Sequence, residues 1–216
     1  MSLSHYLLVA SLLAGVVLIA GCTSNSVQPP GTTTPLTVIP TTNLSFTGQE
    51  NFTILLSDKI LQQSDMPAGF DIFWRGELLR LRPGEDPLGY LGGYDINANR
   101  SLTADKEEKI VHTIVIYNTT AQPIGLVHAF TALYPQLTNS SLSIFDVSGL
   151  GDEGIGYQWS MPRGSIPEDP GMSLSGVLIL FKKDGIIETV HVMGVNTTAN
   201  KTLALELAHK AAAKLA

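Results

Sequence analysis

Apolar and polar residues alternate along this chain of 216 residues with the periods of both strands and helices. Residues 109–117 give the strongest strand pattern, because the run is rich in β-branched side chains and ends at an Asn-Thr-Thr turn. Residues 174–181 and 186–193 are two further apolar strands, and the Asp184-Gly185 step between them is typical of a β-hairpin. From residue 199 to 215, apolar residues recur every three or four positions and predict a C-terminal helix. Its expected buried stripe is Leu203, Leu207, Ala208, Ala211 and Leu215.

Shorter patterns complete the predicted domain. Residues 54–61 form a short apolar element, and residues 70–74 form a strand that ends at Gly76. A loop rich in Gly and Pro follows at 80–93, and residues 94–97 start another strand. A helix is predicted over 123–134, and strands over 141–147 and 157–161, on either side of a turn at 149–156. Together the elements predict an α+β fold, with a mainly antiparallel sheet and helices packed on one face.

The first 22 residues have a different pattern. Residues 6–20 are almost wholly apolar, which is too short to cross a hydrocarbon core of about 30 Å but is typical of a signal peptide. The run ends in Ile19-Ala20-Gly21-Cys22, which contains the only cysteine of the chain. No Lys or Arg precedes the run, although signal peptides normally begin with basic residues. An uncleaved membrane anchor is the alternative.

The Ile19-Ala20-Gly21-Cys22 motif resembles the lipobox of prokaryotic lipoproteins. The resemblance implies that Cys22 is lipidated and becomes the mature N-terminus, so that the protein is held on the outer face of the cytoplasmic membrane. Three regions follow from it: a signal peptide at 1–21, a lipidated Cys with a Thr/Pro/Ser-rich linker at 22–48, and one extracytoplasmic domain at 49–216. Pro and Thr in the linker favour an extended chain.

Composition excludes some partners. The formal net charge of −6 lies entirely after residue 21, and an acidic domain lacks the basic surface that nucleic-acid binding requires. One cysteine cannot form an intramolecular disulfide, so the domain depends on its own hydrophobic core.

Seven of the nine asparagines begin an Asn-X-Ser/Thr triplet and are candidate glycosylation sites. In combining a lipobox with many such triplets, the chain resembles cell-surface lipoproteins of archaea. The alternative is that Asn and Thr are both enriched in turns. The candidates are Asn43, Asn51, Asn99, Asn118, Asn139, Asn196 and Asn200.

Two glycine-containing motifs bear on chemistry. Residues 149–154 spell Gly-X-Gly-X-X-Gly, but the residues that follow cannot form the helix that a dinucleotide site needs, so we expect a tight turn and no cofactor. This turn, followed by strand, hairpin and terminal helix, resembles uncharacterised extracytoplasmic lipoproteins with a PsbP-like shape. Residues 171–176 nearly match the Gly-X-Ser-X-Gly nucleophile elbow, but the fifth position is Ser175.

The remaining candidates are histidines and aromatic residues. His112, His128, His191 and His209 are too widely spaced to predict a metal site. Five aromatics lie near the Gly-rich loops, and we take Trp159, Trp74 and Tyr94 as candidates for a ligand pocket, with a role in the core as the alternative.

The sequence contains no recognisable catalytic arrangement. The leading hypothesis is therefore a membrane-anchored surface lipoprotein whose domain binds a small ligand or an envelope partner. The alternatives are an extracytoplasmic hydrolase with a site assembled from distant residues, and a structural spacer in the envelope.

Overall fold

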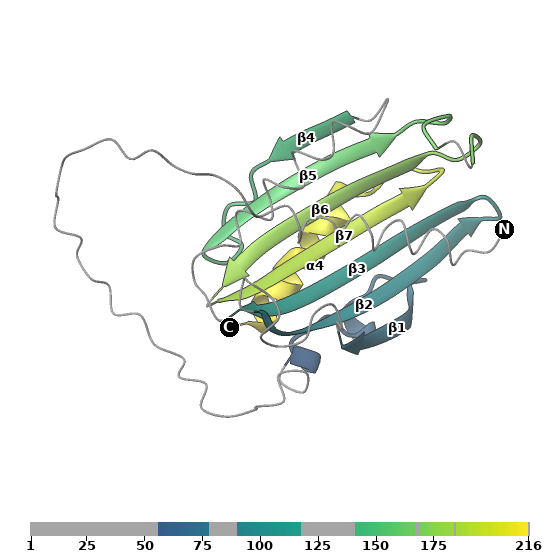
Figure 1. The fold of residues 1–216 in the computed structure, drawn as a ribbon. Coiled ribbons are helices and arrows are strands. Elements are labelled where there is room, and N and C mark those ends of the chain that lie inside the picture. The colour runs from purple at the N-terminus through teal and green to yellow at the C-terminus, as the bar shows by residue number, and fades with distance from the viewer. Residues whose placement is uncertain (1–55, 78–89, 118–140, 167–168, 184, 216) are drawn as a thin grey trace, which may run out of the picture. The chain divides into compact units, whose positions relative to one another are not determined.

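The computed structural model describes residues 56–77, 90–117, 141–166, 169–183 and 185–215. These residues form a seven-stranded sheet in the order β1-β2-β3-β7-β6-β5-β4, and every neighbouring pair is antiparallel (Figure 1). Two runs of consecutive strands, β1 to β3 and β4 to β7, meet where β3 pairs with β7. The strands are β1 (Asp71–Glu77), β2 (Tyr90–Thr103), β3 (Lys106–Tyr117), β4 (Ser141–Phe145), β5 (Glu153–Met161), β6 (Leu174–Lys183) and β7 (Ile186–Val195).

Helix α4 (Lys201–Lys214) crosses β6 and β7 on one side of the sheet, which we call the helix face (Figure 1). The helix begins after Asn200, whose side-chain oxygen accepts a hydrogen bond from the Leu203 N–H and satisfies one of the donors that a helix N-terminus leaves free. Four of the five residues of the expected stripe are buried in the core, and Leu215 is partly buried. On the strands, the same core contains Ile110, Ile114, Val177, Ile179, Val190 and Val192.

We call the opposite side of the sheet, away from α4, the far face. Successive side chains of a strand point to opposite sides. In β5 and β6, Gln158 pairs with Val177 on the helix face, whereas Trp159 pairs with Gly176 on the far face. This alternation decides which side chains can share a site.

Residues 56–70, which include the short 3-10 turn η1 (Gln63–Asp65), pack beside α4 on the helix face. The Arg100 guanidinium forms an ion pair with Glu108, lies 4.5 Å from the centre of the Phe70 ring and donates to the Ala68 carbonyl at 3.1 Å. At the other end, the Lys214 ammonium lies 3.0 Å from an Asp65 carboxylate oxygen. The segment is thus tied both to the sheet and to the end of the helix.

The predicted fold class is wrong. In the described residues, a seven-stranded antiparallel sheet carries one α-helix rather than a layer of helices. Part of the predicted loop, including Gly92 and Gly93, is strand β2, which pairs with β3 along almost its whole length. Strand β3 begins at Lys106, three residues before the predicted strand. The helix predicted at 123–134 lies outside the described residues, and only part of the short element at 54–61 is described.

Several local predictions are confirmed. The β6–β7 hairpin turns at Gly185, whose φ is +82°, and the strands predicted at 70–74, 109–117, 141–147 and 157–161 correspond to β1, β3, β4 and β5. The turn before β5 contains Gly149 and Gly151, with φ of +87° and +62°. A Cβ atom at Gly151 would come within 2.2 Å of the Lys182 carbonyl oxygen, so this turn requires glycine for space as well as for φ.

Candidate functional site

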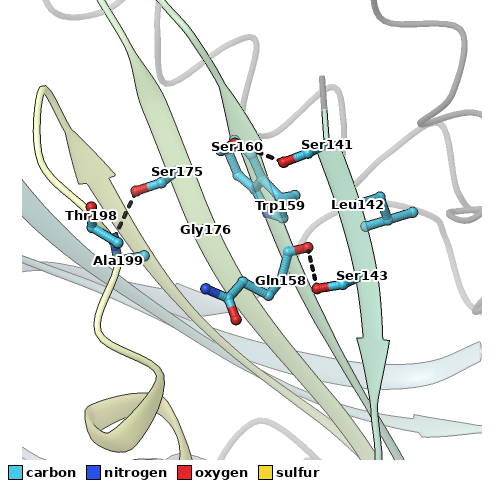
Figure 2. Close-up of a pocket in the computed structure, with 10 residues that line it drawn as sticks. All are labelled: Ser141, Leu142, Ser143, Gln158, Trp159, Ser160, Ser175, Gly176, Thr198 and Ala199. Carbon is cyan, nitrogen blue, oxygen red and sulfur yellow. Dashed lines mark hydrogen bonds between the residues drawn. The ribbon is translucent and has the colours of Figure 1, made fainter. Parts of the chain in front are cut away.

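A polar groove of about 440 Å³ lies on the helix face, between β4, β5 and β6 and the segment that leads into α4 (Figure 2). Its volume falls within the range of small-molecule sites. None of the ten described residues that line it is charged, and five carry a hydroxyl group. The lining residues are Ser141, Leu142, Ser143, Gln158, Trp159, Ser160, Ser175, Gly176, Thr198 and Ala199.

Alternation along the strands explains why the groove is polar. Ser141, Ser143, Gln158 and Ser160 all occupy helix-face positions, and the register pairs Ser141 with Ser160 and Ser143 with Gln158. The α4 helix packs mainly on β6 and β7, so these positions of β4 and β5 lie beyond its apolar stripe. Polar side chains can therefore remain at a partly open surface without burying unpaired groups.

Most of the hydroxyl groups in the groove already have partners. The Ser141 and Ser160 hydroxyls lie 2.8 Å apart, and the Ser143 hydroxyl donates to the Gln158 carbonyl at 3.4 Å. The Ser175 hydroxyl donates to the Thr197 carbonyl at 2.8 Å and accepts from the Ala199 N–H at 2.7 Å. This last pair fixes the chain just before α4 against β6, which makes that wall of the groove rigid.

The side-chain amide of Gln158 is different. Figure 2 shows it directed from β5 over β6, toward the wall formed by Ala199. No side chain or main-chain group among the described residues forms a hydrogen bond with this amide, and the residue is half-buried. An amide carries two donors and one acceptor in fixed geometry, so Gln158 offers a matched donor and acceptor to a molecule in the groove.

Trp159, a predicted pocket residue, belongs to the groove lining, but its indole lies on the far face. There the indole N–H donates to His191 Nε2 at 3.2 Å, and a Cβ atom at Gly176 would meet the ring at 2.2 Å. Burial lowers the pKa of His191 to about 4, which keeps Nε2 unprotonated and able to accept this bond. Burial also raises the pKa of the neighbouring Tyr157 to about 12. Both groups are therefore neutral near pH 7.

The other two predicted pocket residues lie elsewhere. Trp74 is on β1, at the opposite end of the strand order from β4, and is 42% exposed. Tyr94 is on β2 and packs against the core as a partly buried residue. The structure thus does not gather Trp159, Trp74 and Tyr94 in one pocket, and a binding role for each stays a prediction.

A histidine and a carboxylate meet inside the core, on β3 and β7. His112 Nε2 lies 3.0 Å from Glu188 Oε2, while His112 Nδ1 accepts a hydrogen bond from the Leu61 N–H at 3.1 Å. Because Nδ1 accepts, the ring proton resides on Nε2 and is donated to Glu188. The other carboxylate oxygen, Oε1, is buried and has no hydrogen-bond partner among the described residues. Both residues are 0% exposed, so the pair cannot reach a substrate in this conformation and holds the segment at Leu61 to the sheet.

Three of the predicted glycosylation sites are described. Asn200 is exposed and uses only its oxygen to cap α4, so its nitrogen projects without a partner among the described residues. Asn196 has a φ of +52°, accepts from the Ser173 N–H and donates to the Asp105 carbonyl. Asn99 donates to Glu107 at 2.9 Å. A sugar would therefore disturb existing bonds at Asn196 and Asn99 but not at Asn200. The other four candidates and Cys22 lie outside the described residues.

The described residues contain no group of three or more His, Cys, Asp or Glu side chains that could hold a metal ion. Of the widely spaced histidines, His112, His191 and His209 are described, and they lie in the core, on the far face and on the exposed side of α4. Residues 149–152 form a turn, and strand β5 follows from Glu153, so the predicted turn at 149–156 is shorter than expected and no helix follows it. Ser173 precedes strand β6, so the near match to a nucleophile elbow lacks the helix that should follow it.

Sequence reasoning missed Gln158 and Ser175, although one signal was present. Gln158 and Ser160 alternate with apolar or aromatic residues in a strand, which indicates a strand with one polar face. Ser175 is a polar residue in an otherwise apolar strand.

Among the described residues, no helix is long and apolar enough to span a membrane. No protein-family model matches the chain, and neither do the curated proteins or the solved structures with which it was compared.

Proposed function

We propose that this protein is a lipid-anchored surface protein whose sheet domain binds a small neutral ligand in the groove around Gln158. The observation that carries the proposal is the half-buried Gln158 amide, which is directed into the groove and has no hydrogen-bond partner among the described residues. A polar group held at a partly buried position gains most from a ligand that completes its hydrogen bonds.

The chemistry of the lining indicates the class of ligand. Without a charged side chain among the described lining residues, the groove offers no ion pair to a carboxylate, phosphate or ammonium group. Hydroxyl groups and an amide instead suit a molecule that carries its own hydroxyl or amide groups. A short oligosaccharide, with or without N-acetyl groups, has this chemistry and fits a volume of about 440 Å³.

Calorimetry tests the binding. The full-length protein in detergent would be titrated with the trisaccharide of N-acetylglucosamine, with maltotriose and with an N-acetylated tri-alanine peptide. These probes offer both groups, hydroxyls only and amides only. We expect the first to bind most tightly, and Gln158→Ala to weaken it about tenfold through the loss of two hydrogen bonds. Asn97→Ala removes a half-buried strand amide on the far face and is the matched control. Equal binding by both variants would contradict the site.

The anchor is tested separately. We expect the intact mass of protein from its own membrane to correspond to a chain that begins at a lipid-modified Cys22. The Cys22→Ser variant should lack the lipid mass. A mass that still includes residues 1–21 without lipid would support an uncleaved anchor instead. Additional mass in hexose-sized steps would show that some of the predicted asparagines are glycosylated.

A further inference from the structure

Strand β4 (Ser141–Phe145) is the last strand of the sheet beside the groove. Within the described part of the chain it pairs only with β5, and its other edge has no strand partner there. Its sequence contains no charge and no proline, and Ile144 is 58% exposed. Proteins usually protect a sheet edge with charges, proline or a bulge, and β4 has none of these.

We propose that β4 pairs with β4 of a second copy of this chain, antiparallel and centred on Ser143. A two-fold axis places residue i of one copy against residue j of the other and j against i, so the strand must complement itself. Centring on Ser143 places Leu142 opposite Ile144 of the second copy, which makes two apolar cross-strand pairs on the far face. On the helix face, Ser143 meets its own counterpart and Ser141 lies opposite Phe145.

The other edge of the sheet lacks this complementarity. Strand β1 carries Asp71, Arg75 and Glu77, and the register shifts between Ile72 and Trp74, which indicates a bulge. Both features discourage pairing with another strand. The absence of charge in β4 means that its two-fold axis brings no like charges together. The second copy is therefore expected at β4 and not at β1.

The size of the contact sets its strength. Five residues paired with five form about four to six main-chain hydrogen bonds, and the buried area is smaller than the roughly 1,000 Å² of a stable interface. We therefore expect a weak dimer in solution. Copies confined to one membrane by a lipid would meet at a higher effective concentration, so the contact would be populated there.

Pairing would also change the groove. Ser141 lines its outer wall, so Phe145 of the second copy would lie beside that wall and narrow its open side. The effect on the groove and the population of the contact on a membrane rest on the proposed function, but the pairing itself does not. The experiments on pairing are therefore performed without ligand, and their failure would leave the binding of a ligand by one copy untouched.

Cross-linking tests the register. In the Cys22→Ser background, which removes the chain's only thiol, Ser143→Cys introduces one at the proposed axis. Residues directly opposite in an antiparallel pair have Cα atoms about 4.5 or 5.5 Å apart, and both distances permit a disulfide. Because this variant lacks the proposed lipid, it is tested at high protein concentration in detergent, where we expect copper-phenanthroline in air to convert most of it into a disulfide-linked dimer. The control is Ser101→Cys, which changes another exposed strand serine, on β2, far from β4 in the strand order.

Sedimentation velocity of the full-length protein in detergent tests the same contact without a new thiol. We expect a concentration-dependent dimer that Ile144→Lys reduces at least tenfold in association constant, because the substitution puts a lysine of each copy into the contact. Phe73→Lys changes a similarly exposed residue on β1 and should leave the dimer unchanged. A monomer at every concentration, together with no more cross-linking at Ser143→Cys than at Ser101→Cys, would overturn the proposal. Loss of the dimer in Phe73→Lys would move the contact to β1 and overturn it as well.

Discussion

The buried pair His112–Glu188 allows a quantitative test of how residues 56–70 are held to the sheet. Replacing His112 with Leu removes the donor to Glu188 and the acceptor of the Leu61 N–H, both at positions with 0% exposure. A buried carboxylate that loses its partner destabilises a protein by about 3–5 kcal/mol, and the unpaired N–H adds about 1–3 kcal/mol. The two contributions together predict that the free energy of unfolding falls by about 4–8 kcal/mol.

Replacing Glu188 with Leu has a smaller expected effect. It leaves only the His112 Nε2–H unpaired, at about 1–3 kcal/mol, and it removes the carboxylate oxygen that lacks a partner in the described part of the chain. The double variant leaves only the Leu61 N–H unpaired, so it should lose about 1–3 kcal/mol, less than His112→Leu alone. The cycle should therefore give a coupling energy of about 3 kcal/mol or more.

Urea unfolding followed by far-UV circular dichroism measures all four proteins, with His209→Leu as the control. His209 is exposed on α4, so its replacement should change stability by less than about 0.5 kcal/mol. For a domain of this size, the loss in His112→Leu corresponds to a fall in Tm of about 10 °C or more. If the effects of the two single substitutions simply add in the double variant, or if Glu188→Leu is the more damaging, the hydrogen-bond assignment is wrong.

Three further predictions concern the far face and the helix. Gly176→Ala should lower the free energy of unfolding by about 1–3 kcal/mol, because its Cβ would lie 2.2 Å from the Trp159 indole. Gly171→Ala should have little effect in the same urea titration, because its Cβ would make only an ordinary contact, 3.6 Å from Asp169 Oδ1. Because the pKa of His191 is lowered from 6.5 to about 4, the unfolded chain takes up the proton first as pH falls, so stability should decline between those values. The decline should be smaller in His191→Gln, whose side chain can still accept the indole hydrogen bond, and an identical pH profile would contradict this role. Asn200→Ala should cost about 1 kcal/mol through the loss of the helix cap, and unchanged thermal unfolding would show that the cap contributes nothing.

Local features of the fold could be predicted from the sequence because they depend on neighbouring residues. Gly185 allows the turn of the β6–β7 hairpin, and the spacing of Leu203 and Leu207 sets the buried face of α4. Glycines 92 and 93 were misleading, because pairing with β3 holds them in a strand despite their low intrinsic preference for one. The fold class was wrong because strand pairing between distant segments outweighs local composition.

The candidate site could be predicted less well, because the order of the strands brings it together. Ser141, Gln158 and Ser175 become neighbours only when β4, β5 and β6 pair, and Ala199 joins them when α4 packs on the sheet. Alternation does indicate that Gln158 and Trp159 point to opposite faces. It does not indicate which face α4 covers, so the choice of Trp159 as a pocket residue had no basis in local pattern.

The most direct measurement of the central claim is the NMR signal of the Gln158 side-chain amide in ¹⁵N-labelled protein. The signal is assigned by its loss in Gln158→Ala. We predict that the trisaccharide of N-acetylglucosamine shifts it in a saturable way, with smaller changes for the main-chain signals of Ser160 and Ala199 and none for the Asn97 side chain. An unchanged Gln158 signal at saturating probe, for all three probes, would contradict a neutral-ligand site in the groove.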